Sequence, residues 1–593
     1  MPRVRAIAPT VALLPASAAE RFGHEVAARY RLAGEWRELT YTEAAGAIGE
    51  LAFGLIELGL RPGERISILA DTSLQWTLAS YAITCAGAVV VPIYPTSSGS
   101  ECRWVLSDSG ARILFCEDEA QRQKIEQVRA ELPDLEQLVG IQAGGGEISF
   151  DELRERGRAR GKAEVAERSG AVSAEDPYTI IYTSGTTGPP KGVVLTHTNA
   201  MSVCRVVEEL GIVKPGEKTY LYLPLAHSFA LTAQLASYDQ GTTIIYYGGD
   251  TKQIIPEIME TQPTYLPSVP RVFEKLYAMA EAAAGEAGEQ DRERLHSAVA
   301  VGVEVRRRRQ RGEPVPEGLD QAFEKADEAI FSRVRQLFGG QVRQAISGAA
   351  PIAPEILEFF YAAGVPVLEG WGMTETSALG TVATLENFKF GTVGRALPGV
   401  EIRIAPEDGE ILTRGPNVFR EYWRNPGATA EALVDGWLHT GDIGELDGEG
   451  YLRITGRKKD IIITAGGKNL APANIENDLK QSRFISQAVM YGDRRPYPVA
   501  LITLDPEEIM PWASGQGLPE DLRELARRPE VLSVIQNELD RANSHYAQVE
   551  QIKKFAILDH DLSVEGGELT PTLKVKRTVI HDRYADVFDA LYD

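Results

Sequence analysis

The sequence predicts an α/β protein in two parts: a large, doubly wound N-terminal domain with several subdomains, and a small, mobile α+β domain at the C-terminal end. The first observation is an alternation of strand and helix patterns near the start of the chain. It comprises a strand at residues 64–69, a helix at 73–86 and a strand at 88–93. The second is the length of 593 residues, which is too long for a single hydrophobic core.

The third observation is an organisational break at residues 456–460, which read Gly-Arg-Lys-Lys-Asp. Before the break, residues 448–454 have the pattern of a hairpin. After it, an apolar strand at 461–463 and a helix from Pro472 begin a new unit. The expected domains are residues 1–456 and 457–593, with a hinge at 457–460.

The remaining elements follow from local patterns. Residues 39–43 predict a strand that leads into a helix at 44–60, with Thr42 as the N-cap because its hydroxyl can accept a backbone N–H. Residues 273–334 are rich in Ala, Glu and Arg, and we interpret them as solvated helices on the edge of the domain. Further strands are expected at residues 178–181, 340–346 and 365–368.

The composition is that of an acidic globular protein. Hydrophobic residues make up 44% of the chain, and 62 Lys and Arg stand against 84 Asp and Glu, which gives a net charge of −22. This charge argues against a general nucleic-acid binder and against a binder of anionic membranes. The cysteines form no close Cys-x-x-Cys pair, so we expect buried thiols in a reducing compartment instead of a zinc site or a disulfide frame. They are Cys85, Cys102, Cys116 and Cys204.

Neither a membrane span nor a secretory leader is expected. The apolar stretch at residues 81–92 is too short to cross a bilayer. Residues 6–19 resemble a weak signal peptide, but Pro9 and Pro15 interrupt them, so we expect an ordinary N-terminal extension. The expected location is the cytoplasm, with peripheral contact at the inner membrane face left open.

A loop rich in hydroxyl groups and glycine carries the strongest functional signal. Residues 182–192 read Tyr-Thr-Ser-Gly-Thr-Thr-Gly-Pro-Pro-Lys-Gly. Its glycines let backbone N–H groups approach an anion, and its lysine adds a positive charge. It is not a Walker A loop, because Pro190 precedes the lysine and Gly192 follows it. A flexible surface turn is the alternative, which the consecutive prolines disfavour. We expect a polyphosphate at Thr183, Ser184, Gly185, Thr186, Thr187, Gly188 and Lys191.

This loop resembles the phosphate-binding signature of the adenylate-forming superfamily, which includes acyl-CoA synthetases, luciferases and the adenylation domains of peptide synthetases. The resemblance covers nearly the whole chain. It implies an acyl-CoA synthetase-like fold, ATP as a substrate and Mg²⁺ as the metal that accompanies it.

A small-residue segment matches the adenine side of the superfamily. Residues 347–351, Ser-Gly-Ala-Ala-Pro, follow a predicted strand and precede a predicted helix. Small side chains there would let a flat ring lie against the backbone, although a routine strand-to-helix turn has the same pattern. The resemblance assigns Gly348, Ala349 and Ala350 to nucleotide binding.

Residues 369–375, Glu-Gly-Trp-Gly-Met-Thr-Glu, match a second signature. We expect them to form a loop at the end of a parallel strand, where α/β sheets bind ligands. Thr374 can donate to a phosphate, and Glu375 offers a hard oxygen ligand for Mg²⁺; a helix start with Thr374 as N-cap is the alternative. The resemblance assigns adenine and the acyl pocket to Glu369, Gly370 and Trp371, the α-phosphate to Thr374 and the metal to Glu375, with Gly372 and Met373 in the same signature.

Three further polar residues have two interpretations each. Asp442, which ends Trp-Leu-His-Thr-Gly-Asp, can accept both hydroxyls of a ribose or can cap a turn. Arg457 offers a fork of donors to ribose or phosphate, or forms a surface ion pair. His227 lies in an apolar stretch and can be structural, whereas the resemblance places it near the substrate carboxylate.

Residues 569–577, Leu-Thr-Pro-Thr-Leu-Lys-Val-Lys-Arg, concentrate positive charge. A solvated basic surface strand is one interpretation. The superfamily has a lysine here that reaches the reacting carboxylate and the α-phosphate, and by motif position it is Lys574. Leu573 stands where many members have glycine, and Lys576 stays open as the alternative. The form of this segment is similar to the long-chain acyl-CoA synthetase branch.

Together these residues imply one reaction in two steps. The acid attacks the α-phosphorus of ATP and pyrophosphate leaves, which requires cations and oriented donors instead of a covalent nucleophile. A thiol then attacks the acyl-adenylate after the C-terminal domain turns about its hinge. By resemblance Lys459 is the pivot, and Gly466, Gly467 and Lys468 line the pantetheine channel. The expected catalytic residues are Lys574, Thr374, Glu375, His227 and Lys191.

Residues 269–277, Val-Pro-Arg-Val-Phe-Glu-Lys-Leu-Tyr, look like those of long-chain fatty acid–CoA ligases. A fatty acid, ATP and coenzyme A are therefore the expected partners. The alternatives are a fatty acyl-AMP ligase that loads a carrier protein, a ligase for aryl or amino acids, and a non-catalytic binder of nucleotide or fatty acid. We expect no nucleic-acid partner, and a homodimer is left open.

Overall fold

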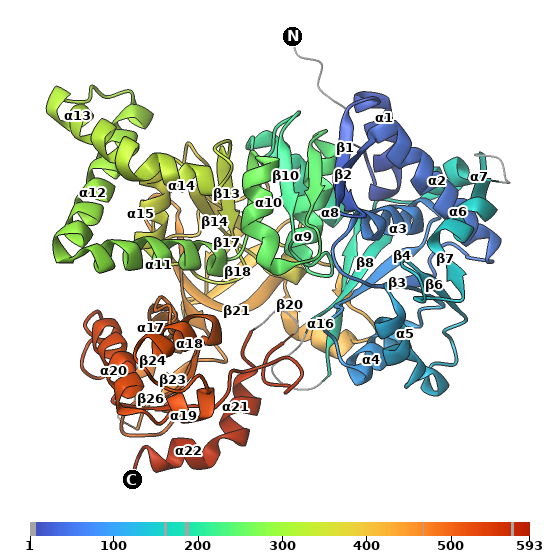
Figure 1. The fold of residues 1–593 in the computed structure, drawn as a ribbon. Helices are drawn as coiled ribbons and strands as arrows, with labels where there is room; N and C mark the ends of the chain where they lie inside the picture. Colours follow the sequence, from blue (N-terminus) through green and yellow to red (C-terminus); the bar gives the residue numbers. More distant parts are fainter. Residues whose placement is uncertain (1–7, 159–162, 184–188, 466–467, 571–573) are drawn as a thin grey trace.

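The computed structural model describes residues 8–593 except residues 159–162, 184–188, 466–467 and 571–573. Two large sheets with their covering helices form most of the molecule, and the elements from β23 onward gather beside them (Figure 1, red). The expected α/β architecture is confirmed, with a smaller mixed unit at the C-terminal end.

The first sheet has nine strands, and its central strands are parallel. This sheet presents the carboxyl end of β14 to the candidate site. Its strands in spatial order are β16 (Arg395–Ala396), β15 (Thr381–Val382), β14 (Val367–Trp371), β13 (Gln344–Ser347), β12 (Tyr265–Ser268), β10 (Lys218–Leu221), β11 (Thr243–Tyr246), β1 (Val26–Leu32) and β2 (Glu35–Thr40).

The second sheet has eight strands, and an antiparallel edge extends its parallel part. The loop expected to bind phosphate joins β8 to β9, which pair antiparallel with Thr183 opposite Lys191. The strands in spatial order are β19 (Glu421–Tyr422), β9 (Lys191–Thr196), β8 (Pro177–Thr183), β4 (Val89–Ile93), β3 (Arg65–Leu69), β5 (Ile113–Cys116), β6 (Gln137–Gly140) and β7 (Ile148–Ser149).

A smaller antiparallel sheet carries the hairpin that precedes the expected hinge. It consists of β17 (Glu401–Ile404), β18 (Glu410–Arg414), β21 (Trp437–Leu446), β20 (Leu433–Val434) and β22 (Leu452–Arg457). The C-terminal unit follows with β23 (Ile462–Ile463), β24 (Asn469–Leu470), β25 (Ile485–Tyr491), β26 (Val499–Leu504) and β27 (Lys554–Ile557).

Helices cover both large sheets and the C-terminal unit (Figure 1). The N-terminal helices are α1 (Leu14–Phe22), α2 (Tyr41–Glu57), α3 (Leu74–Cys85), α4 (Gly99–Ser109), α5 (Glu119–Glu126), α6 (Phe150–Arg158), α7 (Ala163–Ala171), α8 (His197–Glu209), α9 (Ser228–Asp239) and α10 (Ile254–Thr261). Next come α11 (Pro270–Ala287), α12 (Glu289–Arg311), α13 (Glu317–Ala326), the π-helix η4 (Asp327–Phe331), α14 (Ser332–Leu337), α15 (Pro354–Ala363) and α16 (Pro426–Ala432). The C-terminal helices are α17 (Pro472–Leu479), α18 (Pro506–Gly515), α19 (Leu522–Leu525), α20 (Pro529–Asn543), α21 (Arg577–Arg583) and α22 (Ala585–Ala590).

One apolar core joins the two large sheets. It contains side chains from β3, β4 and β8 of one sheet, from β10 to β14 of the other, and from helices α2, α3, α8 and α9. Helix α3 is buried at every position except Gln75, as expected for an element enclosed by others. Residues from Ile462 onward form apolar clusters of their own. The C-terminal unit therefore has its own core, and its boundary at residues 456–457 stays a prediction.

The four cysteines are buried and free, as expected. Residues 273–334 are largely helical, also as expected, and extend outward as α11 to α13 (Figure 1). None of the helices in the described part of the chain combines the length and the apolar character that a membrane crossing requires.

Several element boundaries differ from those expected. The N-cap of α2 is Thr40 and not Thr42, because the Thr40 hydroxyl and the Glu43 carboxylate form a reciprocal capping box. The Thr42 hydroxyl instead donates to the Gly23 carbonyl. Strand β13 begins at Gln344, not at residue 340, because Gly340 has a left-handed φ of 75° that ends an extended segment.

The segment expected as a loop after residue 368 is partly strand. Strand β14 extends to Trp371, because Gly370 and Trp371 pair antiparallel with Val382 and Thr381 of β15. Thr374 begins a single 3₁₀ turn, Thr374–Thr376, whose N-cap is Met373 and not Thr374. The signature therefore places Glu369 to Trp371 at the carboxyl end of β14, with Thr374 and Glu375 just beyond it.

Candidate active site

The loop lysine and the expected metal ligand lie in one region although they are far apart in sequence. The Nζ of Lys191 lies 5.1 Å from the ring centroid of Tyr422. The Tyr422 hydroxyl donates a hydrogen bond of 2.7 Å to Oε1 of Glu375. Residues Ser184–Gly188 of the expected phosphate loop lie outside the described residues. Lys191, at the end of that loop, and the Glu375 carboxylate therefore both contact Tyr422, which lies between them.

The Glu375 carboxylate is buried, with 6% of the residue exposed. Burial raises its pKa, and the hydrogen bond from Tyr422 opposes that shift. The pKa also responds to the charges of Arg457, which lowers it, and of Asp442, which raises it. Glu375 thus lies close enough to both residues for their charges to act on it.

Asp442 is the acceptor at the centre of this region. It lies on β21, not at a turn, and it pairs with Arg457 of β22 in the strand register. The Arg457 Nε donates to Oδ1 of Asp442 at 2.7 Å, and the Trp371 Nε1 donates to Oδ2 at 2.9 Å. Because each carboxylate oxygen has two lone pairs, the carboxylate can still accept further hydroxyl groups. The structure therefore brings Trp371, Asp442 and Arg457 together.

His227 immediately precedes helix α9 and is held by the backbone. Its Nδ1 accepts the Phe229 N–H at 3.1 Å, so the proton of the neutral ring lies on Nε2. Burial and the positive charge of Lys574 lower the pKa of His227 to about 4. The next residue, Ser228, places its hydroxyl 3.5 Å from that of Thr374. His227 is therefore a neutral hydrogen-bond donor beside the Thr374 signature.

The two candidate lysines of the C-terminal segment point to different surroundings. The pKa of Lys574 is lowered by burial and by Arg457, and raised by Asp442, so its ammonium lies among the site charges even though part of the residue is exposed. Lys576 instead places its Nζ 3.6 Å from Oε1 of Glu101 on α4. This arrangement favours Lys574 as the lysine that reaches the site.

The small-residue segments have backbone features that suit a ligand surface. Ala349 has a φ of 71°, a left-handed conformation that is uncommon outside glycine and often occurs at functional sites. Neighbouring Gly348 is buried against the Phe229 ring, whereas Ala350 is exposed. A Cβ on Gly372 would lie 2.2 Å from the Ala378 carbonyl oxygen, so a side chain does not fit there.

The Glu369 carboxyl is buried, and burial raises its pKa to about 8. Gly370 packs against Leu379, and Met373 packs partly buried against the main core. These residues lie with Trp371 at the carboxyl end of β14 and just beyond it. The Glu369 side chain is therefore expected to be neutral at physiological pH, which suits a wall of a binding site better than a metal ligand.

The lysines expected near the hinge are exposed and make no contact with the Asp442 group in the described part of the chain. Lys459 is exposed in the turn between β22 and β23. Lys468 is also exposed, and its Nζ lies 3.6 Å from Oε1 of Glu550. Gly466 and Gly467 lie outside the described residues. This arrangement does not join Lys459 or Lys468 to the group around Asp442.

The donor set fits Mg²⁺ that arrives with ATP. Within the described ranges, no three His, Cys, Asp or Glu side chains gather as a protein cage for a metal. Mg²⁺ often binds through one or two carboxylates together with substrate phosphates and water. Glu375 supplies one such carboxylate, opposite the lysine of the expected phosphate loop.

The sequence alone does not indicate Tyr422 or Ser228. Tyr422 reaches Glu375 because β19 pairs with β9, with Tyr422 opposite Val193. A tyrosine in an ordinary aromatic stretch gives no sign of that long-range pairing. Ser228 directly follows His227, which the sequence does single out, and this adjacency is the one sequence signal for Ser228.

The proximity of Lys574 and His227 gives a direct spectroscopic prediction. In protein labelled at histidine, the His227 ring signal should not titrate between pH 5.5 and 8.5, because its pKa is about 4. In Lys574→Ala the pKa of His227 should rise, since removal of a nearby positive charge favours the imidazolium. Comparison with His227→Gln assigns the signal. An unchanged His227 pKa in Lys574→Ala would place the two side chains apart in solution.

The chain belongs to the AMP-binding enzyme family. A family model described as AMP-binding enzyme matches residues 16–423, and a model described as AMP-binding enzyme C-terminal domain matches residues 459–593. The membership in the adenylate-forming superfamily expected from the motifs is thereby confirmed.

Two relatives match this chain over most of its length. The long-chain-fatty-acid–CoA ligase FadD15 of Mycobacterium tuberculosis is 40% identical over 567 residues, which cover 94% of this chain and 93% of that protein. The long-chain-fatty-acid–CoA ligase ACSBG1 of Mus musculus is 30% identical over 622 residues, which cover 97% of this chain and 84% of that protein.

Solved structures share the fold. The anthranilate CoA ligase AuaEII in complex with anthranoyl-AMP matches with a TM-score of 0.74 at 20% identity and covers 98% of both chains. A Mycobacterium tuberculosis fatty acyl CoA synthetase matches with a TM-score of 0.63 at 23% identity, over 98% of this chain and 99% of that one. At these identities the likeness establishes the α/β fold and nothing about the substrate.

Proposed function

We propose that this protein is a long-chain fatty acid–CoA ligase that releases AMP and pyrophosphate. The observation that carries the proposal is the convergence of Lys191, Glu375, Asp442 and Lys574 on one region of the molecule. The ligases that are 40% and 30% identical supply the acid and the thiol of the proposal.

The first half-reaction needs charge stabilisation more than covalent chemistry. A fatty acid oxygen attacks the α-phosphorus of ATP, and pyrophosphate departs. Lys574 would stabilise the charge on the reacting carboxylate and the α-phosphate, and Lys191 would do so on the leaving pyrophosphate. Mg²⁺, when bound with ATP and Glu375, supplies Lewis-acid charge neutralisation. The neutral His227 would donate its Nε2–H to a carboxylate oxygen.

The nucleotide would be held from the opposite side. The resemblance assigns the ribose to Asp442, whose carboxylate is already oriented by Trp371 and Arg457. Two fixed donors prevent rotation of the carboxylate, which reduces the entropy lost when a ribose binds. Gly348, Ala349 and Ala350 would lie against adenine, and Thr374 would donate to the α-phosphate.

The second half-reaction would require a different arrangement of the C-terminal unit, because Lys574 occupies the site in this one. The contacts to be broken include Arg271 to Asp505 at 2.6 Å and Lys275 to Glu507 at 2.9 Å. Partly exposed ion pairs contribute about 0–1 kcal/mol each, so they would bias the rearrangement without preventing it. We propose Lys459 as the pivot, with Gly466, Gly467 and Lys468 on the path of the pantetheine arm.

A panel of acids tests the proposed substrate. Purified protein with ATP, Mg²⁺ and coenzyme A should release AMP fastest with long-chain fatty acids, and slower with short-chain, aromatic or amino acids. Adenylate formation without transfer to free coenzyme A would identify a ligase that loads a carrier protein. Absence of acid-dependent AMP release with every acid would contradict an enzymatic function.

A further inference from the structure

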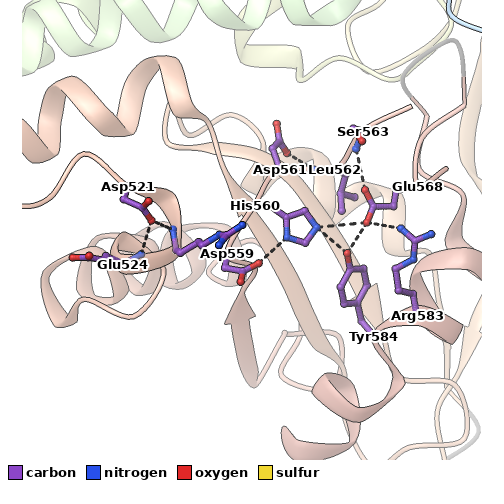
Figure 2. Close-up of polar contacts among 11 residues, drawn as sticks. Asp521, Glu524, Asp559, His560, Asp561, Leu562, Ser563, Glu568, Arg583 and Tyr584 are labelled. Carbon is purple, nitrogen blue, oxygen red and sulfur yellow. Dashed lines mark hydrogen bonds and ion pairs between the residues drawn. The ribbon is translucent and has the colours of Figure 1, made fainter. Parts of the chain in front are cut away.

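A buried carboxylate outside the candidate active site collects donors from two segments of the C-terminal unit, one after β27 and one at the junction of α21 and α22. The side chain of Glu568 is 3% exposed. It accepts the Ser563 N–H at 3.1 Å and the Tyr584 hydroxyl at 2.5 Å, and it pairs with Nη1 of Arg583 at 2.9 Å. Figure 2 shows the Ser563 N–H and the side chains of Arg583 and Tyr584 converging on Glu568, with His560 beside them.

The same residue lies at the base of the segment that presents Lys574. The Glu568 carbonyl accepts the Lys576 N–H at 2.8 Å, and Leu569 forms an antiparallel bridge with Val575. Next along this ladder, the Thr570 N–H donates to the Lys574 carbonyl at 2.7 Å. The Lys574 backbone is therefore two hydrogen-bonded steps from the Glu568 anchor.

We propose that Glu568 is a positioning residue that acts through Lys574: its buried carboxylate fixes the base of this ladder to α21, α22 and the segment after β27, and so aims the lysine into the active site. This proposal rests on the adenylation role proposed for Lys574. Glu568 itself contacts neither the site residues described above nor the Arg457 and Asp442 pair.

The donor arrangement explains why a carboxylate stands at this position. An isolated buried anion would be strongly destabilising, so its retention requires several well-placed partners. Ser563 donates from the segment after β27, Arg583 from the end of α21, and Tyr584 from the start of α22. Hydrogen bonds to both carboxylate oxygens fix orientation more strongly than apolar packing does, because apolar contact is non-directional.

His560 extends this network toward solvent. Its Nδ1 lies 2.7 Å from Asp559, and its Nε2 lies 3.0 Å from the Tyr584 hydroxyl, which already donates its single proton to Glu568 (Figure 2). Nε2 can therefore make that contact as a donor, and an imidazolium satisfies both of its contacts at once. The contact from His560 thus helps to hold the Tyr584 hydroxyl in the orientation in which it donates to Glu568.

The test separates positioning from general stability. Glu568→Ala should lower the adenylation half-reaction, measured as acid-dependent ATP–pyrophosphate exchange, by about 10- to 100-fold, since a misplacement of about 1 Å can cost that much. Thioester formation from supplied acyl-adenylate and coenzyme A should stay within about threefold. The pKa of His227, followed by NMR, should rise toward its value in Lys574→Ala, because the lysine has left its place.

A double-variant cycle identifies the route of the effect. Lys574→Ala combined with Glu568→Ala should exchange no more slowly than Lys574→Ala alone, since the second change acts through a lysine that is already absent. Additive losses, or wild-type exchange by folded Glu568→Ala, would overturn the proposal. Native exchange by Lys574→Ala alone would instead refute the adenylation role on which the proposal rests.

Two further variants keep the result interpretable. Glu568→Gln preserves the shape of the side chain and some of its hydrogen bonds, so it should fold even if Glu568→Ala does not. It should lower adenylation by about 3- to 10-fold and leave thioester formation within the same limits as in Glu568→Ala. Asp561→Asn is the matched control. Asp561 lies in the same segment but anchors Ser486 and Thr503 of the C-terminal sheet, at 2.7 and 2.6 Å, and not the ladder. It should leave exchange within about threefold at a comparable loss of thermal stability.

Discussion

Replacing Lys574 with alanine is expected to slow adenylation by about 10²- to 10³-fold, the usual effect of losing one electrostatic stabiliser of a transition state. The ammonium lies among His227, Arg457 and Asp442, where developing negative charge on the carboxylate and the α-phosphate would be felt. Thioester formation from preformed acyl-adenylate should survive, because that step occurs after the C-terminal unit has turned away. ATP–pyrophosphate exchange and transfer from supplied adenylate measure the two steps separately.

Lys576→Ala is the matched control for this prediction. Lys576 is two residues away and carries the same charge, but its ammonium faces Glu101 at 3.6 Å, with both side chains partly exposed. A partly exposed ion pair of this kind contributes little, so exchange should change by less than about threefold. Equal loss of both half-reactions in Lys574→Ala, or a larger loss in Lys576→Ala, would refute the assignment.

Much of the site could be predicted because its residues lie in short contiguous signatures. Lys191, Glu375 and Asp442 each stand in a segment whose residue types are chemically specific, and the structure brings these segments together. The choice between Lys574 and Lys576 could not be made from the segment alone. That choice depends on where the side chains of Lys574 and Lys576 point, which the packing of the C-terminal unit against the rest of the chain decides.

Residues that act through tertiary pairing could not be predicted. Tyr422 reaches Glu375 through the pairing of β19 with β9, and Glu568 gathers donors that lie up to 16 positions away along the chain. Strand β14 continues through Gly370 and Trp371 because β15 pairs with it, although Glu-Gly-Trp-Gly alone indicates a loop. In each case the deciding contact joins segments whose proximity local propensity does not encode.

Replacing Glu375 with glutamine should lower ATP–pyrophosphate exchange by about 10²- to 10³-fold, because it removes the buried negative charge that would hold Mg²⁺ with ATP. The amide oxygen can still accept the Tyr422 hydroxyl, which donates at 2.7 Å in the native protein, so the fold should be retained. Measured against Mg²⁺ concentration, exchange by Glu375→Gln should reach half its maximum at a higher concentration than in the native enzyme.

Tyr422→Phe separates the effect of the Glu375 charge from the effect of the hydrogen bond that Tyr422 donates to it. This change removes the hydrogen bond to the carboxylate but leaves the charge and the aromatic ring under Lys191, so exchange should fall by less than about tenfold with an unaltered Mg²⁺ dependence. If the two variants lost activity equally, the Tyr422 hydroxyl would matter to exchange as much as the negative charge of Glu375 does. If Glu375→Gln kept native exchange and a native Mg²⁺ dependence, the metal would have to be held by ATP and water without this side chain, since no cluster of three acidic, histidine or cysteine ligands exists in the described part of the chain.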